Sequence, residues 1–306
     1  MTNRLLMIRP ANFGFNVETA ASNAFQQQMS DSDPASVAQL GLQEFDQTVK
    51  TLRENGIDVL VLDDSADPVK TDAVFPNNWI STHEGGILVT YPMANPSRRN
   101  EVRLDLVDEL KSRFNVNRWW KLHEEAPEGK FLEGTGSLVL DHENRIAWAC
   151  RSPRTDEELV RQFCEQMDFE PQMFGAIDDQ GLPIYHTNVM MAVTTKHVIL
   201  CLECIRDESQ REEITRRIAA TEKQVVELTW PQIEAFAGNM LQLEDHNRQP
   251  CIALSTTAKK SLREDQLQTI ESESRIIELD IPTLETCGGG SVRCMLAENY
   301  LLPKGR

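Results

Sequence analysis

The sequence predicts an α/β fold of five pseudo-symmetric units arranged in one closed ring. Five segments begin with Asn or Gly and run into a short apolar stretch typical of a β-strand. Their leading positions, 78, 136, 188, 239 and 290, are separated by 58, 52, 51 and 51 residues. A solenoid of such units leaves two ends to cap, whereas a ring can close on itself. Because a strand is predicted at 5–8 and another near the end of the chain, closure is the better interpretation.

Each unit is predicted to contain two strands, a helix and a third strand. The repeat starts at 78–81, 136–140, 188–191, 239–243 and 290–295 are interpreted as the first strands. β-branched residues and flanking turn residues indicate neighbouring strands at 86–90, 145–148 and 197–201. Further apolar runs at 59–62, 225–228 and 276–279 are predicted to be third strands. The units therefore repeat the order strand, strand, helix, strand.

The helices are predicted from their capping signals and apolar spacing. Asp33 and Pro34 begin a helix that runs to about residue 55, with Gly56 as the residue after its end. Thr155 and Glu158 form a capping box before the next clear apolar face. Asp207 opens a helix that reaches about residue 223, and a helical pattern covers 255–270. These helices would connect the second and third strands of their units.

Charge and cysteine content restrict the partners and the compartment. There are 31 basic and 48 acidic residues, a net charge of −17, which disfavours nucleic acid and anionic membranes. No apolar stretch approaches the roughly 20 residues of a spanning helix, and residues 1–10 do not resemble a signal peptide. Seven scattered cysteines suit a reducing cytoplasm, so a cytoplasmic protein is expected. Cys201 and Cys204 have the spacing of half a zinc site, but a strand over 198–204 would point them to opposite faces, so no metal site is expected.

The repeat starts carry a selective set of polar side chains. In a ring, equivalent strand starts face one centre, so residues far apart in sequence can meet there. A cysteine with a histidine is the pairing used for nucleophilic attack by a thiolate and proton transfer by an imidazole. The glycines at 288–290 would leave room for a substrate beside the nucleophile. The candidate site residues are Asn77, Asn78, Glu133, His186, Asn188 and Cys294.

Four motifs resemble those of the guanidino-group modifying enzymes. They are Phe-Pro-Asn-Asn at 75–78, Glu-Gly-Thr-Gly at 133–136, His-Thr-Asn at 186–188, and Gly-Gly-Gly-Ser-Val-Arg-Cys-Met at 288–295. That superfamily includes arginine deiminases, amidinotransferases and dimethylarginine dimethylaminohydrolases, and its fold is the pentein α/β-propeller. The resemblance extends along essentially the whole chain, which implies one domain over residues 1–306. It also implies that Cys294 is the nucleophile, His186 the general acid and base, and Glu133 a substrate-binding carboxylate.

Two departures from the arginine-processing pattern bear on the substrate. Arginine deiminases carry aspartates where this chain has Asn78 and Asn188. A guanidinium offers only hydrogen-bond donors and suits carboxylates, whereas a neutral ureido group has a carbonyl oxygen that carboxamides can bind. The pattern looks most like the citrulline-utilising hydrolase branch, which implies conversion of citrulline to ornithine, ammonia and carbon dioxide. No cofactor is implied.

Several alternatives stay open at this point. Arginine deiminase, dimethylarginine hydrolase and amidinotransferase activities are alternatives within the enzymes, and a catalytically inactive ring that binds arginine-type ligands or partner proteins is the alternative outside them. Cys294 also fits a buried strand cysteine, and asparagines are common at turns for backbone reasons. The expected partner is a small amino-acid substrate, and a homodimer is left open. Residues 9–16 are a candidate contact for the amino-acid tail or a candidate lid.

Overall fold

The computed structural model describes residues 1–20, 23–29 and 33–305, and its strands form five separate three-stranded sheets. In every sheet the middle strand pairs antiparallel with one neighbour and parallel with the other. The sheets are β15 (Ala297–Glu298), β1 (Arg4–Arg9) and β2 (Asp58–Asp63); β3 (Ile80–His83), β4 (Ile87–Thr90) and β5 (Arg118–Lys121); β6 (Val139–Asp141), β7 (Ile146–Arg151) and β8 (Glu170–Gly175); β9 (Met191–Val193), β10 (His197–Leu200) and β11 (Gln224–Glu227); and β12 (Leu241–Glu244), β13 (Pro250–Ser255) and β14 (Arg275–Leu279).

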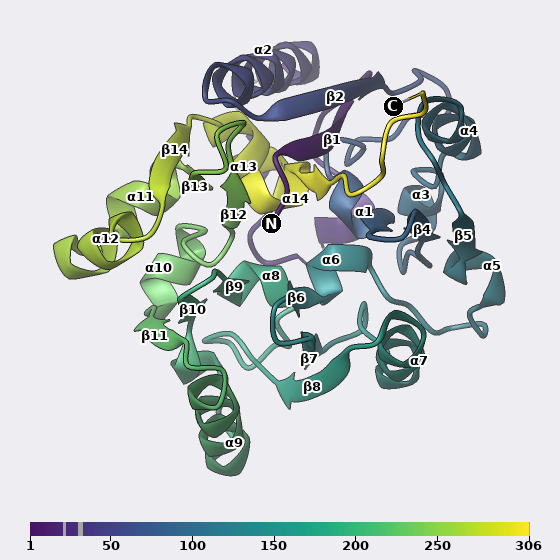
Figure 1. Ribbon diagram of the computed structural model, residues 1–306. Helices are drawn as coiled ribbons and strands as arrows, with labels where there is room; N and C mark the ends of the chain where they lie inside the picture. Colours follow the sequence, from purple (N-terminus) through teal and green to yellow (C-terminus); the bar gives the residue numbers. More distant parts are fainter. Residues whose placement is uncertain (21–22, 30–32, 306) are drawn as a thin grey trace.

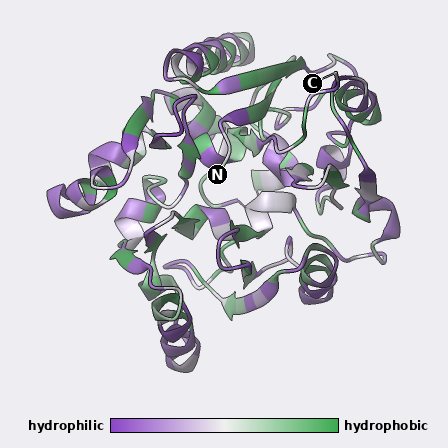
Figure 2. Cartoon of the chain, viewed as in Figure 1, coloured by the Kyte–Doolittle hydropathy of each residue, from purple (hydrophilic) through white to green (hydrophobic). Residues whose placement is uncertain are grey.

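The parallel pair of each sheet is joined by helices, and the longer ones lie on the outside of the molecule (Figure 1). This is the expected connection, because parallel neighbours need a crossover, usually a helix. The crossover helices are α2 (Pro34–Glu54); α3 (Pro96–Arg99) and α4 (Leu104–Arg113); α7 (Glu157–Met167); α9 (Glu208–Ala219); and α11 (Thr256–Ser261) and α12 (Glu264–Glu271). Figure 2 shows hydrophobic residues concentrated in the strands and hydrophilic residues prominent on these outer helices.

The two ends of the chain meet in one sheet. Strand β1 pairs in parallel with β2 and antiparallel with β15, where Leu5 lies opposite Glu298. The five sheets lie around a common centre (Figure 1), which agrees with the predicted five-unit α/β fold. Strand pairing in the described ranges stays within each sheet, however, so no continuous hydrogen-bonded sheet joins the units.

The hydrophobic core fills the space between the sheets and their helices. Its largest fully buried side chains include Trp79, Trp148, Tyr91, Phe45 and Phe163. The outer helices contribute one apolar face each, as helix α7 does with Leu159, Val160 and Phe163. The core packs the outer helices against their own sheets and against neighbouring sheets, and it leaves the polar repeat starts at the centre.

The repeat starts form short helical turns, which corrects the predicted strands there. The turns are η1 (Pro76–Asn78), α6 (Gly134–Ser137), α8 (Thr187–Met190) and α14 (Val292–Met295), and each comes just before the strand of its unit. Asn239 also lies outside a strand, two residues before the start of β12. A single helical turn spans only four residues, too few to show a helical period in the sequence. Tertiary packing at the centre sets these turns, as is usual for helices too short to be stable alone.

The outer helices follow the sequence signals with local differences. Helix α2 begins after the N-cap Asp33, and Gly56 beyond its end has a φ of 83°, as predicted. The N-cap of α7 is Asp156 rather than Thr155, because the Asp156 carboxylate accepts from the backbone N–H of Glu158 and Leu159. Helix α9 starts at its N-cap Asp207 but ends at residue 219, and the predicted helix over 255–270 is two helices, α11 and α12.

The remaining helical segments are short and lie in the connections. They are α1 (Val17–Ala20), α5 (Leu122–Glu125), η2 (Leu202–Cys204), α10 (Trp230–Glu234) and α13 (Pro282–Gly288). Within the part of the chain that the structure describes, no helix combines the length and apolar character needed to cross a membrane.

Candidate active site

The central turns bring the candidate cysteine and histidine to one cavity. Cys294 lies in α14, and His186 is the N-cap of α8. Both side chains are almost completely buried and line the same small cavity, as does Asn78 at the end of η1. Residues more than 100 positions apart in sequence thus meet where the repeat spacing predicts.

The sulfur of Cys294 accepts hydrogen bonds from two asparagine side chains. Asn188 Nδ2 lies 3.5 Å from Sγ, and Asn239 Nδ2 lies 3.3 Å from it. Both asparagines are buried, with exposed fractions of 1%. Because N–H donors stabilise negative charge on their acceptor, this arrangement favours a sulfur that becomes anionic during a reaction.

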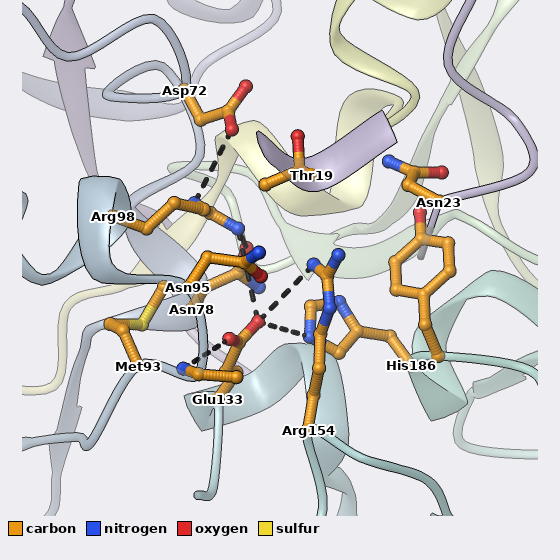
Figure 3. Close-up of polar contacts among 12 residues, drawn as sticks. Thr19, Asn23, Asp72, Asn78, Met93, Asn95, Arg98, Glu133, Arg154 and His186 are labelled. Atoms are coloured by element: carbon orange, nitrogen blue, oxygen red, sulfur yellow. Dashed lines mark hydrogen bonds and ion pairs between the residues drawn. The ribbon is translucent and has the colours of Figure 1, made fainter. Parts of the chain in front are cut away.

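Glu133 orients the imidazole of His186. Its Oε2 lies 2.8 Å from His186 Nε2, and its Oε1 accepts from the backbone N–H of Ala94 at 3.0 Å. An ionised carboxylate can only accept, so Nε2 carries the proton and Nδ1 remains available as a base. Arg98 and Arg154 also lie near the same carboxylate oxygen, at 3.9 Å and 3.6 Å, and Figure 3 shows these groups converging on Glu133.

Burial and charge act differently on this pair. Burial lowers the pKa of His186 to about 4, and the hydrogen bond with Glu133 only partly offsets that effect. Burial alone would raise the pKa of Glu133, but Arg154, His186 and Arg98 outweigh it and hold this pKa well below its ordinary value. At neutral pH the pair therefore consists of a carboxylate and a neutral imidazole that can accept a proton from a thiol.

We expect the lowered pKa of His186 to make the fold sensitive to acid. Its pKa is about 4 in the folded state against an ordinary value of 6.5, so the unfolded chain binds the proton first as the pH falls. The stabilisation is fully present above about pH 6.5 and is lost towards pH 4, a change of about 3 kcal/mol in the free energy of unfolding. Urea unfolding across this range should show a steeper loss for the wild type than for His186→Gln. Parallel curves for the two proteins would contradict the expectation.

Asn78 lies between a second asparagine and an arginine. Its Oδ1 accepts from Arg98 Nη1 at 3.0 Å, and its Nδ2 donates to Asn77 Oδ1, also at 3.0 Å. Asn77 is fully buried. It does not line the described cavity wall itself, but it contacts Asn78, which does. Glu101 holds the Arg98 guanidinium through two hydrogen bonds of 2.8 Å. The arginine is therefore fixed in direction beside the candidate site.

The cavity beside Cys294 is narrow, and both arginines in its wall are paired with carboxylates behind the wall. It measures about 20 Å³, enough for one water molecule, so binding an amino acid requires its lining side chains to move. Two guanidinium groups, of Arg98 and Arg154, face one carboxylate, of Asp72, in the described lining. Asp72 already lies 3.6 Å from Arg98 and accepts from Asn16 Nδ2 at 2.7 Å. Burial raises the pKa of Asp72, and the neighbouring Arg98 only partly offsets this effect.

A larger cavity of about 380 Å³ lies elsewhere in the molecule. Its wall includes Asn188 and Arg293, but neither Cys294 nor His186. Size would favour this cavity over the one beside Cys294, yet the nucleophile and the base line the smaller one, and Glu133 contacts the base from behind its wall. We therefore assign the candidate active site to the cavity beside Cys294.

Sequence reasoning did not identify four polar residues at the site, which are Asp72, Arg98, Arg154 and Asn239. The first three come from loops or short crossover segments, which no repeat position marks. Asn239 stands at a repeat start, so the spacing that marked Asn188 was the available signal. Within 9–16, Arg9 instead pairs with Asp46 at the surface, and Asn16 contacts the cavity residue Asp72.

The cysteine pair at 201 and 204 is placed differently from the prediction. Strand β10 ends at Leu200, and the turn η2 brings the two sulfurs to 3.1 Å instead of pointing them to opposite faces. The chain's seven cysteines are all buried free thiols. In the described ranges, no group of three or more histidine, cysteine, aspartate or glutamate side chains could hold a metal ion.

Comparison with known families agrees with this site. Residues 9–301 match the family described as N,N dimethylarginine dimethylhydrolase, eukaryotic. The chain belongs to this dimethylarginine dimethylhydrolase family. That places it among the guanidino-group modifying enzymes, as its motifs predict, and confirms a hydrolase of carbon–nitrogen bonds other than peptide bonds. No curated protein matches the chain.

Solved structures share the fold of this dimethylarginine dimethylhydrolase family member at low sequence identity. ArgZ, an arginine dihydrolase from the ornithine–ammonia cycle in cyanobacteria, superposes with a TM-score of 0.74 and 17% identity, over 96% of this chain and 40% of ArgZ. A variant of the ArgZ N-terminal domain, covalently bonded to a reaction intermediate, gives 0.74 and 16%, over 96% of both chains. A dimethylarginine dimethylaminohydrolase variant in an adduct with S-methyl-L-thiocitrulline gives 0.66 and 14%, over 97% of this chain and 99% of that one. This chain thus spans about two fifths of full-length ArgZ and nearly all of its N-terminal domain.

Proposed function

We propose that the protein hydrolyses citrulline to ornithine, ammonia and carbon dioxide through a carbamoyl thioester on Cys294. The observation that carries this proposal is the set of carboxamides around Cys294. Asn188 and Asn239 contact its sulfur and Asn78 lines the cavity, whereas the carboxylate of the described wall, Asp72, already contacts Arg98 and Asn16. A cationic guanidino head group would find no free carboxylate among these described groups, whereas a neutral ureido group can accept hydrogen bonds from the carboxamides.

The two arginines of the wall support the head-group end of the site. Arg98 is held by Glu101, and Arg98 and Arg154 lie 3.9 Å and 3.6 Å from Glu133 Oε2 (Figure 3). Arg98 also donates to Asn78 Oδ1 at 3.0 Å, which fixes the Asn78 amide beside the cavity. We therefore place the ureido group of citrulline at this wall, with its carbon towards Cys294 and His186.

The reaction follows from the order of these groups. The imidazole of His186 takes the proton of the Cys294 thiol, and the thiolate adds to the ureido carbon. The imidazolium then returns its proton to the departing nitrogen, ornithine leaves, and a carbamoyl group remains on sulfur. Water, activated by the neutral imidazole, cleaves this thioester, and the resulting carbamate decomposes to ammonia and carbon dioxide. The net reaction consumes one water per citrulline.

Glu133 acquires a different role from the one that the resemblance implies. Both of its oxygens are occupied, by His186 and by the Ala94 backbone, and it is not in the described cavity wall. We propose that Glu133 orients His186 rather than binding the substrate head group. Asn78 and Asn188 remain the proposed donors to the oxygen that becomes negative during attack.

Hydrolysis of dimethylarginine is the second candidate. Family membership over residues 9–301 favours it directly. Covalent chemistry occurs in proteins of this fold, since an ArgZ variant is bonded to a reaction intermediate and a dimethylarginine dimethylaminohydrolase variant forms an adduct. Dimethylarginine is a cation, however, and the carboxamides at the sulfur of Cys294 do not supply the carboxylate that its charge would favour.

We also propose that residues 1–306 act as one domain whose five units close into a ring. Pairing of β1 with β15 places both ends of the described chain in one unit, which supports closure. A single domain of this form would explain why the proposed active site draws on all four central turns and on Asn239 from the remaining unit.

Product analysis tests the proposed function. The purified protein is incubated separately with citrulline, arginine and dimethylarginine, and amino acids and ammonia are measured. We expect ornithine and ammonia in equal amounts from citrulline. Citrulline as the product from arginine or dimethylarginine, with no ornithine from citrulline, would instead assign a deiminase or a dimethylarginine hydrolase.

Exchanging the two proposed oxyanion donors for carboxylates should alter substrate preference. We expect Asn78→Asp combined with Asn188→Asp to lower kcat/KM for citrulline by about 100-fold or more, since an oxyanion-hole donor contributes roughly 3–4 kcal/mol. The same change should strengthen arginine binding by adding two carboxylates around the cation. Single variants should lie between, although neighbouring charges rarely add independently.

Kinetics with both substrates across the four proteins measure this effect. Asn299→Asp is the matched control, because Asn299 is also buried but lies outside the cavity wall. A wild type that prefers arginine, or a double variant that processes citrulline unchanged, would show that Asn78 and Asn188 do not select the substrate.

A further inference from the structure

Asn239 joins three of the central segments through one amide group. Its Nδ2 donates to the backbone carbonyl of Asn188 at 2.9 Å and to Cys294 Sγ at 3.3 Å. Asn188 in turn donates to the same sulfur. Each of these residues comes from a different repeat, so this amide fixes the sulfur and its other donor relative to one another.

The bonding of Asn239 is not that of an ordinary structural asparagine. Its side chain is buried with an exposed fraction of 1%, yet its Oδ1 has no hydrogen-bond partner among the described residues. Buried polar atoms are normally paired, and those left unpaired commonly occur at functional sites. Nδ2 of Asn239 donates both of the described side-chain hydrogen bonds, one to the sulfur and one to the neighbouring turn. The NH2 group of the amide, and not its oxygen, is therefore the part that acts at this site.

The N–H donors around Cys294 stabilise its sulfur strongly in only one protonation state, the thiolate. A neutral thiol is a weak acceptor, whereas a thiolate is an anion that N–H groups stabilise strongly. Asn239 is absent from the described wall of the cavity beside Cys294, so its direct partner is the sulfur and not the substrate. Its contribution should therefore appear when Cys294 loses its proton.

We propose that Asn239 is a further catalytic residue, which stabilises the thiolate of Cys294 and holds Asn188 at the same sulfur. The proposal rests on the proposed role of Cys294 as nucleophile, whatever the substrate. When the thiolate attacks, negative charge leaves the sulfur for the substrate oxygen, and the bond to Asn239 weakens. Asn239 thus promotes formation of the attacking species and does not bind the amino acid.

Alkylation of Cys294 tests this without any substrate. Iodoacetamide is applied to wild type, Asn239→Ala and Asn239→Asp over a range of pH, and the modified Cys294 peptide is quantified by mass spectrometry. We expect Asn239→Ala to react about tenfold more slowly at neutral pH, with the difference closing at alkaline pH. Asn239→Asp, of nearly the same shape, should react more slowly still, because a carboxylate repels the thiolate. Asn299→Ala, another buried asparagine, should react like the wild type.

Steady-state kinetics add a second readout. With the active substrate, kcat should fall while KM stays within about twofold, since Asn239 lies outside the cavity wall. Folding of each variant is checked by circular dichroism, and Asn239→Ser replaces any variant that does not fold. Identical alkylation profiles in folded variants, or a raised KM with unchanged kcat, would overturn the proposal. If citrulline is not a substrate but the alkylation profiles shift as expected, the proposed substrate fails and the role of Asn239 stands.

Discussion

Replacing Cys294 with alanine is expected to abolish turnover while leaving the fold intact. The sulfur lines the cavity and accepts hydrogen bonds from Asn188 and Asn239, so it is placed to react. Removing it deletes one small side chain from the cavity wall, which should lower the free energy of unfolding by only about 1 kcal/mol. Cys294→Ser should be nearly inactive as well, because an alkoxide is far harder to form than a thiolate.

Ornithine release and thermal unfolding of the same preparations measure the two effects. Cys287→Ala is the matched control, since Cys287 is another buried thiol in the preceding helix α13 but lies outside the cavity wall. It should retain activity close to that of the wild type. Substantial turnover by Cys294→Ala or Cys294→Ser would disprove covalent catalysis at this position.

The second large effect is expected at His186. His186→Ala should lower kcat by about 100-fold or more, the usual contribution of a general acid and base. The neutral imidazole is the form that accepts the thiol proton, and burial favours that form by lowering its pKa to about 4. Glu133→Gln should lower kcat by less than His186→Ala does, because the amide keeps a hydrogen-bonding group beside Nε2 but loses the charge that stabilises an imidazolium.

His83 is a buried histidine away from the cavity, and its variant is a control that separates an effect on catalysis from an effect on stability. Burial also lowers the pKa of His83, to about 3, and its Nε2 lies 2.7 Å from Ser81 Oγ, outside the cavity wall. His83→Ala should therefore affect thermal unfolding more than kcat. Equal losses of kcat in His83→Ala and His186→Ala, at equal folded fractions, would remove the assignment of His186 as the base.

The repeat spacing predicted the architecture because each unit must bury the same kind of apolar strands against its helix. The strands at 5–8, 59–62 and 276–279 occur within β1, β2 and β14. The spacing also marked Cys294 and His186, which line one cavity although 108 positions separate them in sequence. Periodicity therefore identified the positions that a repeated fold directs to its centre.

Residues outside the repeat pattern could not be found in this way. Arg98 reaches the site from a short helix in a connection, and Arg154 from the loop before α7, so only tertiary packing brings them there. Glu133 was expected to bind substrate, but its role depends on which neighbours occupy its oxygens. The local helix at Cys294 was missed because four residues carry no helical period.

Trapping the enzyme during turnover tests the central claim most directly. The protein is mixed with citrulline labelled at its ureido carbon, quenched in acid within the first turnover, digested, and mapped by mass spectrometry. The proposed mechanism predicts a labelled carbamoyl group on the peptide that contains Cys294, and none in Cys294→Ala. Label on a different residue, or an unlabelled protein while ornithine accumulates, would contradict it.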